Sequence, residues 1–64
     1  MKNLLEILDT TEGFIAVYTG TTGEGEEVVE EEAHNLRGAS KEDREAEALT
    51  IWGVDRDTVE ITHL

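Results

Sequence analysis

The chain has 64 residues and no cysteine, and sixteen acidic residues against five basic ones give a formal net charge of −11. This charge argues against binding to nucleic acid or to an anionic membrane, because both require a basic protein surface. The lack of cysteine excludes disulfides and thiolate metal sites. We therefore expect one small domain over residues 1–64, whose core contributes only about 3–5 kcal/mol of net stability.

The first third of the chain has the pattern of a β-hairpin. Residues 4–8 form an apolar block, and residues 9–13 have the composition of a turn. Residues 14–19 are rich in β-branched and aromatic side chains, which favours a strand. Two such runs around a short glycine-containing loop predict a hairpin, although the leucines of the first run also fit one helical turn. Residues 20–25 are predicted to form a flexible loop.

Charge is concentrated in the next segment, where six of the nine residues from 24 to 32 are glutamates. Val29, Ala33 and Leu36 follow at the i, i+4 and i+7 spacing of one helix face. This periodicity predicts an amphipathic helix with the glutamates on or beside its solvent face. Gly38 would end that helix, with Arg37 favourably placed in its last turn.

A second helix is predicted to begin at Ser40, whose side chain can cap free N–H groups, and to run to about residue 48 or 49. Residues 49–53 either continue this helix to Gly53 or form an extra strand. Residues 58–63 alternate apolar and polar side chains, which predicts a strand with one buried face. The expected fold is α+β in the order ββααβ, with an antiparallel sheet packed by one or two helices.

No pattern in the chain points to catalysis or to a bound cofactor. Glu31 and His34 have the Glu-x-x-His spacing of di-iron bundles, but the further ligands and helices of such sites are missing. Ser40 is the only serine and is better used as a helix cap. We therefore expect no catalytic residues, no metal and no cofactor, and we place Trp52 in the core.

Residues 47–59 loosely resemble the helix-turn-helix segment of many repressors. The second helix of that motif would present Asp55, Asp57 and Glu60 to DNA. Because DNA phosphates repel these carboxylates, direct binding to nucleic acid is not expected.

The glutamate cluster needs a reason, because like charges at i and i+4 of a helix cost about 0.2–0.5 kcal/mol per pair. Glu26 with Glu30 and Glu27 with Glu31 would form such pairs. A dense row of carboxylates attracts basic surfaces over a long range. The candidate partner-binding residues are Glu24, Glu26, Glu27, Glu30, Glu31, Glu32, Glu42, Asp43, Glu45 and Glu47.

In size, charge and the cluster at residues 24–32, the chain resembles the small acidic DNA-mimic inhibitors encoded by phages, including anti-CRISPR and anti-restriction proteins. These inhibitors share no common fold or motif. The resemblance implies stoichiometric blockade of the DNA- or RNA-binding surface of a host defence nuclease or CRISPR complex. It also implies a monomer or homodimer in the host cytoplasm, with no contact to membrane.

Three other interpretations fit the same composition. The chain could be an acidic interaction or assembly module for a basic protein unrelated to nucleic acid. It could be a halophile protein, although acids spread evenly over the chain would then be expected. It could also be a designed miniprotein, although the like-charge pairs contradict design practice.

Overall fold

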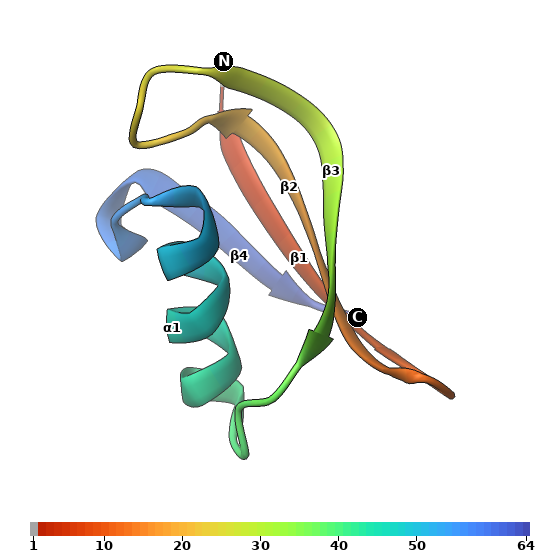
Figure 1. The fold of residues 1–64 in the computed structure, drawn as a ribbon. Coiled ribbons are helices and arrows are strands. Elements are labelled where there is room, and N and C mark those ends of the chain that lie inside the picture. Colours follow the sequence, from red (N-terminus) through yellow and green to blue (C-terminus); the bar gives the residue numbers. More distant parts are fainter. Residues whose placement is uncertain (1) are drawn as a thin grey trace.

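The computed structural model describes residues 2–64, which form a four-stranded sheet with one helix packed on one face (Figure 1). The elements in chain order are β1 (Asn3–Thr10), β2 (Gly13–Thr21), β3 (Glu27–Leu36), α1 (Lys41–Trp52), the 3₁₀ turn η1 (Arg56–Thr58) and β4 (Val59–His63). The sheet order is β3-β2-β1-β4. The predicted α+β character is confirmed, whereas the predicted order ββααβ is wrong, because the order is βββαβ.

The predicted first hairpin is confirmed. β1 and β2 pair antiparallel, with Leu5 opposite Tyr18 and Ile7 opposite Ala16, so the first apolar run is a strand and not a helical turn. The Thr10 hydroxyl donates to the Gly13 carbonyl at 2.6 Å across the turn. Gly13 has a φ of 117°, a backbone conformation that residues with a Cβ rarely adopt.

The predicted acidic helix is wrong, because its residues form the edge strand β3, paired antiparallel with β2. Val29, which should lie on the buried face of that helix, is 74% exposed. The pairing shifts register twice, and Glu30 (φ 49°) and Asn35 (φ 62°) lie in the left-handed region within these shifts. Each β-bulge inserts one extra residue between inward-facing positions.

The helix predicted at Ser40 is confirmed as α1. The Ser40 hydroxyl accepts a hydrogen bond from the Asp43 backbone N–H at 3.1 Å, and Gly53 ends the helix with φ of 63°. Residues 49–52 therefore continue the helix and form no extra strand. The prediction that Gly38 ends a helix is wrong, because Gly38 lies in the connection between β3 and α1.

The final strand is confirmed, and it pairs parallel with β1, so the sheet is mixed rather than antiparallel. Residues 53–58 lead from α1 into β4 through a single 3₁₀ turn. No second helix of a helix-turn-helix motif follows α1 within the part of the chain that the structure describes. The chain thus passes from one edge strand, β3, through α1 to the other edge strand, β4.

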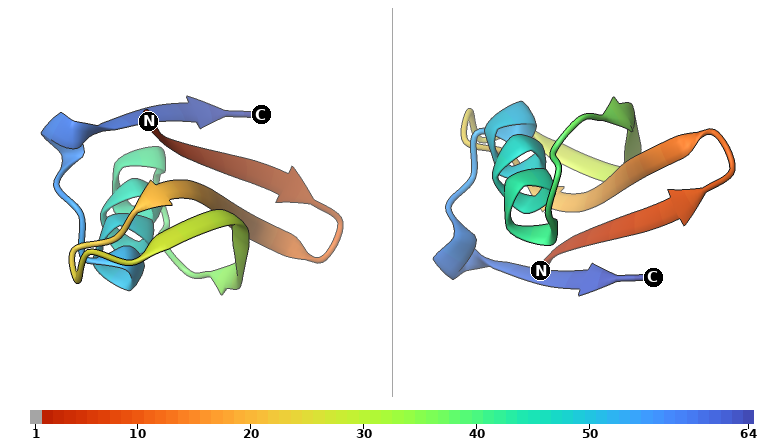
Figure 2. Two further views of the ribbon diagram at one scale, coloured as in Figure 1. Left: turned by 90° about the horizontal axis from the view of Figure 1, so that it is seen from above. Right: turned by 90° about the horizontal axis from the view of Figure 1, so that it is seen from below.

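The core lies between α1 and the face of the sheet that curls around it (Figure 2). Its buried residues are Leu5, Ile7, Ala16, Tyr18, Leu36, Ala48, Leu49 and Trp52. The rings of Trp52 and Tyr18 stack with centroids 5.2 Å apart, which confirms Trp52 as a core residue. None of the helices described between residues 2 and 64 has the length and apolar character needed to cross a membrane.

Candidate functional site

The β2–β3 hairpin carries the predicted acidic cluster on its loop and its outer strand. Glu24 and Glu26 lie in the loop, and Glu27, Glu30, Glu31 and Glu32 lie on β3. All six are exposed, and no lysine or arginine occurs between residues 3 and 36. The whole β1–β2–β3 meander therefore lacks a permanent cation, and the hairpin is its most acidic part.

Of the predicted loop over residues 20–25, Gly20 and Thr21 belong to β2, and the rest is connected by hydrogen bonds of its own. Thr22 donates its backbone N–H to the Glu26 carbonyl at 2.7 Å, and its hydroxyl accepts from the backbone N–H groups of Glu24 and Glu26. Gly23 donates to the Trp52 carbonyl at 2.9 Å, which fixes the loop against the end of α1. A Cβ on Gly23 would lie 2.0 Å from the Gly53 carbonyl oxygen, so this close approach requires glycine.

Glu31 and Glu32 lie on opposite faces of the sheet, because they pair with Tyr18 and Val17 respectively. On the helix side, the Glu31 Oε1 accepts a hydrogen bond from the Trp52 indole N–H at 2.6 Å. On the other side, the Glu32 carboxylate lies 3.0 Å from His34 Nε2, and both side chains are exposed. Glu31 therefore contributes to the fold, whereas Glu32 is available to a partner.

The four acidic candidates on α1 separate in the same way. Glu42 and Asp43 are exposed in the first turn, where carboxylates interact favourably with the helix dipole. Glu47 instead accepts hydrogen bonds from the backbone N–H groups of Arg37 and Gly38 at 2.9–3.1 Å. It thereby fixes the connection between β3 and α1, a structural role that the sequence did not indicate.

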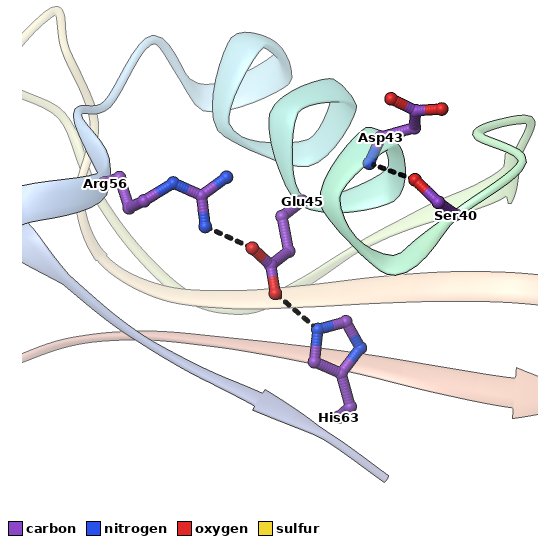
Figure 3. Close-up of polar contacts among 5 residues, drawn as sticks. All are labelled: Ser40, Asp43, Glu45, Arg56 and His63. Carbon is purple, nitrogen blue, oxygen red and sulfur yellow. Dashed lines mark hydrogen bonds and ion pairs between the residues drawn. The ribbon is translucent and has the colours of Figure 1, made fainter.

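Glu45 joins α1 to the C-terminal part of the chain (Figure 3). Its carboxylate bonds the Arg56 guanidinium through Oε1 and His63 Nε2 through Oε2, the latter at 2.5 Å. The hydrogen bond to His63 and then that to Arg56 lower the pKa of Glu45 from its ordinary value. With an exposed side-chain fraction of 14%, this carboxylate is a bridge within the fold and is poorly placed to bind a partner.

Arg44 and Tyr18, which the sequence analysis did not name as site residues, stabilise two other parts of the domain. The Arg44 guanidinium carbon lies 3.8 Å from the centroid of the Phe14 ring, within the range of a cation–π contact. Arg44 also donates from Nη1 to the Gly38 carbonyl at 3.0 Å. The burial of Tyr18 raises the pKa of its phenol, which donates to the Thr21 carbonyl at 2.7 Å.

The structure thus divides the predicted site residues into two groups by the contacts that they make. Glu31, Glu45 and Glu47 bond within the domain, and Glu42 and Asp43 lie on the helix rather than on the hairpin. The remaining glutamates define what we call the hairpin acidic surface: Glu24, Glu26, Glu27, Glu30 and Glu32. Glu31 and His34, whose Glu-x-x-His spacing the sequence analysis noted, contact different partners: Glu31 accepts a hydrogen bond from Trp52, and His34 lies against Glu32.

Comparison with known proteins gives no relative for this chain. No family model, no curated protein and no solved structure matches it. The function must therefore be inferred from the chemistry of the surface itself.

Proposed function

We propose that this protein is an acidic inhibitor that imitates the charge of a nucleic acid and occupies the DNA- or RNA-binding surface of a basic protein. The target class that we favour is a host defence nuclease or CRISPR complex, blocked by stoichiometric binding without chemistry. One observation carries the proposal: the hairpin acidic surface places five exposed glutamates on a segment without lysine or arginine.

The extended geometry of β3 supports this proposal, because it arranges the glutamates along a line. Side chains two residues apart on one face of a β-strand are separated by about 6–7 Å along the strand, and each strand of B-DNA carries one charge per roughly 3.4 Å of helix axis, so both present a linear series of negative charges. Glu30 and Glu32 lie two residues apart on this strand, and Glu27 extends the series toward the loop. A groove that binds a phosphate backbone would attract such a series by long-range steering.

Few ion pairs within the domain neutralise the glutamates of the hairpin acidic surface. Among residues 2–64, the ion pairs are Lys2–Glu60, His34–Glu32, Arg56–Glu45 and His63–Glu45. Of the five glutamates of the hairpin acidic surface, these pairs include only Glu32, whose partner is an exposed histidine. Since unpaired like charges destabilise a compact state, the cluster is best explained by a partner outside the chain.

The decisive experiment is affinity purification of the partner from a bacterial extract, followed by competition with duplex DNA and with RNA for that partner. We expect mutually exclusive binding, with an affinity that falls as the salt concentration rises. A stable ternary complex of this protein, the partner and its nucleic acid would disprove the mimic. A partner that binds no nucleic acid would instead support the alternative, an acidic assembly module.

A charge-matched pair of triple variants tests the location of the surface. Glu27→Gln, Glu30→Gln and Glu32→Gln together should weaken partner binding at least about tenfold, since each lost ion pair contributes up to about 1 kcal/mol. The control combines Glu12→Gln, Asp55→Asn and Asp57→Asn, which remove the same charge from exposed positions elsewhere. Equal losses in both variants would show that net charge, not the hairpin, determines binding.

A further inference from the structure

A hollow of about 320 Å³ lies between the β2–β3 loop and the C-terminal end of α1. Thr22, Glu24 and Glu26 line it from the loop, Glu31 from β3, and Thr50 and Trp52 from the helix. The hydrogen bond from Gly23 to the Trp52 carbonyl joins the loop to the helix end, so both sides of the hollow are held in place. Its volume is at the lower end of the roughly 300–1,000 Å³ typical of ligand pockets.

Every charged group that lines this hollow is negative. The carboxylates of Glu24, Glu26 and Glu31 are joined by the negative end of the α1 dipole, because the lining includes the last residues of that helix. The last turn of α1 contains no basic residue to compensate that end. The field in the hollow therefore favours a cation.

The arrangement of the acceptors indicates which kind of cation fits. No group of three or more His, Asp or Glu side chains within residues 2–64 is placed so that it could hold a metal ion. The three carboxylates are therefore distributed around the hollow instead of converging on one point. An extended cation with several donors matches this arrangement better than a point charge does.

The guanidinium group of arginine has five N–H donors in a planar fork and is more weakly hydrated than an ammonium group. Trp52 is also among the residues that line the hollow, although only 5% of its surface is exposed. The Trp52 N–H holds Glu31 Oε1, which fixes the orientation of this carboxylate before any ligand arrives. The Thr50 hydroxyl, which donates to the Ala46 carbonyl, can add a neutral acceptor.

We propose that this hollow receives one arginine side chain from the basic partner. The inference rests on the proposed function and deepens it. The hairpin acidic surface attracts the partner, and the hollow binds one of its arginines and so fixes the orientation of the complex. Glu24 and Glu26 serve both, because they line the hollow and lie on the hairpin. Glu27, Glu30 and Glu32 do not line it.

The hollow can be tested without the partner, using the blocked tripeptide acetyl-Gly-Arg-Gly-amide as probe. Trp52 is the only tryptophan, so its fluorescence reports on the hollow directly. We expect saturable binding on the order of millimolar, as suits a single side chain. Amide chemical shifts should change for residues 22–26 and 50–53. The same peptide with citrulline in place of arginine keeps the shape but loses the charge, and it should not bind.

Two charge-matched double variants complete the test. Glu24→Gln with Glu26→Gln should weaken the arginine peptide about three- to tenfold, at the scale of two partly exposed charge contacts. Glu12→Gln with Asp57→Asn removes the same charge at exposed positions outside the hollow and outside the hairpin acidic surface, and it should change binding less than twofold. Equal losses, shift changes spread over all acidic residues, or equal binding of citrulline would overturn the proposal.

These outcomes are independent of the proposed function. If the peptide fails to bind while the full protein still competes with nucleic acid for a partner, the hollow is refuted and the mimic stands. If the peptide binds as expected but no competition with nucleic acid occurs, the hollow stands and the mimic is refuted.

Discussion

Trp52 donates its indole N–H to the Glu31 carboxylate at 2.6 Å, so an aromatic core residue of α1 is tied to one glutamate of the acidic strand β3. A largely buried indole requires an acceptor, because an unsatisfied donor costs about 1–3 kcal/mol. This hydrogen bond gives Glu31 a structural role that the neighbouring glutamates do not share, although the sequence gives no sign of the difference.

The first prediction concerns this bond. Glu31→Ala should lower the free energy of unfolding by about 1–2 kcal/mol, whereas Glu31→Gln, which keeps an acceptor oxygen, should lose less than half of that. Urea denaturation followed by Trp52 fluorescence measures both. The control is Glu32→Ala on the opposite face of the sheet, which should change the stability by less than about 0.5 kcal/mol. If Glu31→Ala and Glu32→Ala behave alike, the bond contributes nothing.

The second prediction concerns Glu45, whose pKa is lowered by its hydrogen bonds to His63 and Arg56. A carboxyl group with a lowered folded-state pKa stabilises the fold fully above its unfolded value, which is 4.5. That contribution is lost as the pH falls through the lower, folded-state pKa. At pH 7 the wild type should therefore exceed Glu45→Gln in unfolding free energy by about 1 kcal/mol.

The difference between these two proteins should shrink as the pH falls below about 4.5. Denaturant titrations at several pH values measure it, and taking the difference removes the effect of the other carboxylates, which the two proteins share. A difference that does not vary between pH 7 and pH 3 would show that the Glu45 bridge is not ionic.

The third prediction uses the left-handed conformation of Glu30, with φ of 49°. Such a conformation costs a non-glycine residue roughly 1–2 kcal/mol, and glycine is free of this cost but loses more chain entropy on folding. Glu30→Gly should therefore stabilise the protein by about 0.5–1 kcal/mol in thermal or urea unfolding. Glu30→Gln removes the same charge but keeps the Cβ, so it isolates the backbone effect; equal stabilities of the two variants would contradict the argument.

The fourth prediction concerns Glu47, which accepts hydrogen bonds from the backbone of Arg37 and Gly38. Glu47→Ala should destabilise the domain by about 1–3 kcal/mol, because charge-assisted bonds to two N–H groups are lost. Hydrogen exchange of these two amides should accelerate more than that of the β1–β2 pair. Glu12→Ala, at an exposed position outside α1, is the control and should leave both quantities nearly unchanged.

The sequence predicted the parts of the fold whose signals are local. The β1–β2 hairpin, the Ser40 cap and the final strand follow from turn, capping and alternation patterns, whereas the end of α1 at Gly53 was one of two alternatives. The parallel pairing of β4 with β1 could not be predicted, because it joins residues more than fifty positions apart. It leaves no pattern within either strand.

The misassigned strand β3 has a specific physical explanation. Its inward positions are Val28, Glu31, Ala33 and Leu36, with spacings of three, two and three residues, because a bulge lies in each longer interval. The two bulges interrupt the alternation expected of a strand, and the exposed Val29 then completes an apparent helical spacing with Ala33 and Leu36. The glutamates that serve the fold were hidden for a related reason, since their partners Trp52, His63 and Gly38 are distant in sequence.

The hydrogen bond from Gly23 to the Trp52 carbonyl has a consequence for how the protein could be recognised. Because the loop is already ordered, a partner would meet its carboxylates without first restricting a mobile chain, and association would lose little conformational entropy. Charge and order can therefore be separated experimentally. Gly23→Ala leaves the net charge at −11 but forces the loop off the helix end, so it would show how much recognition depends on arrangement alone.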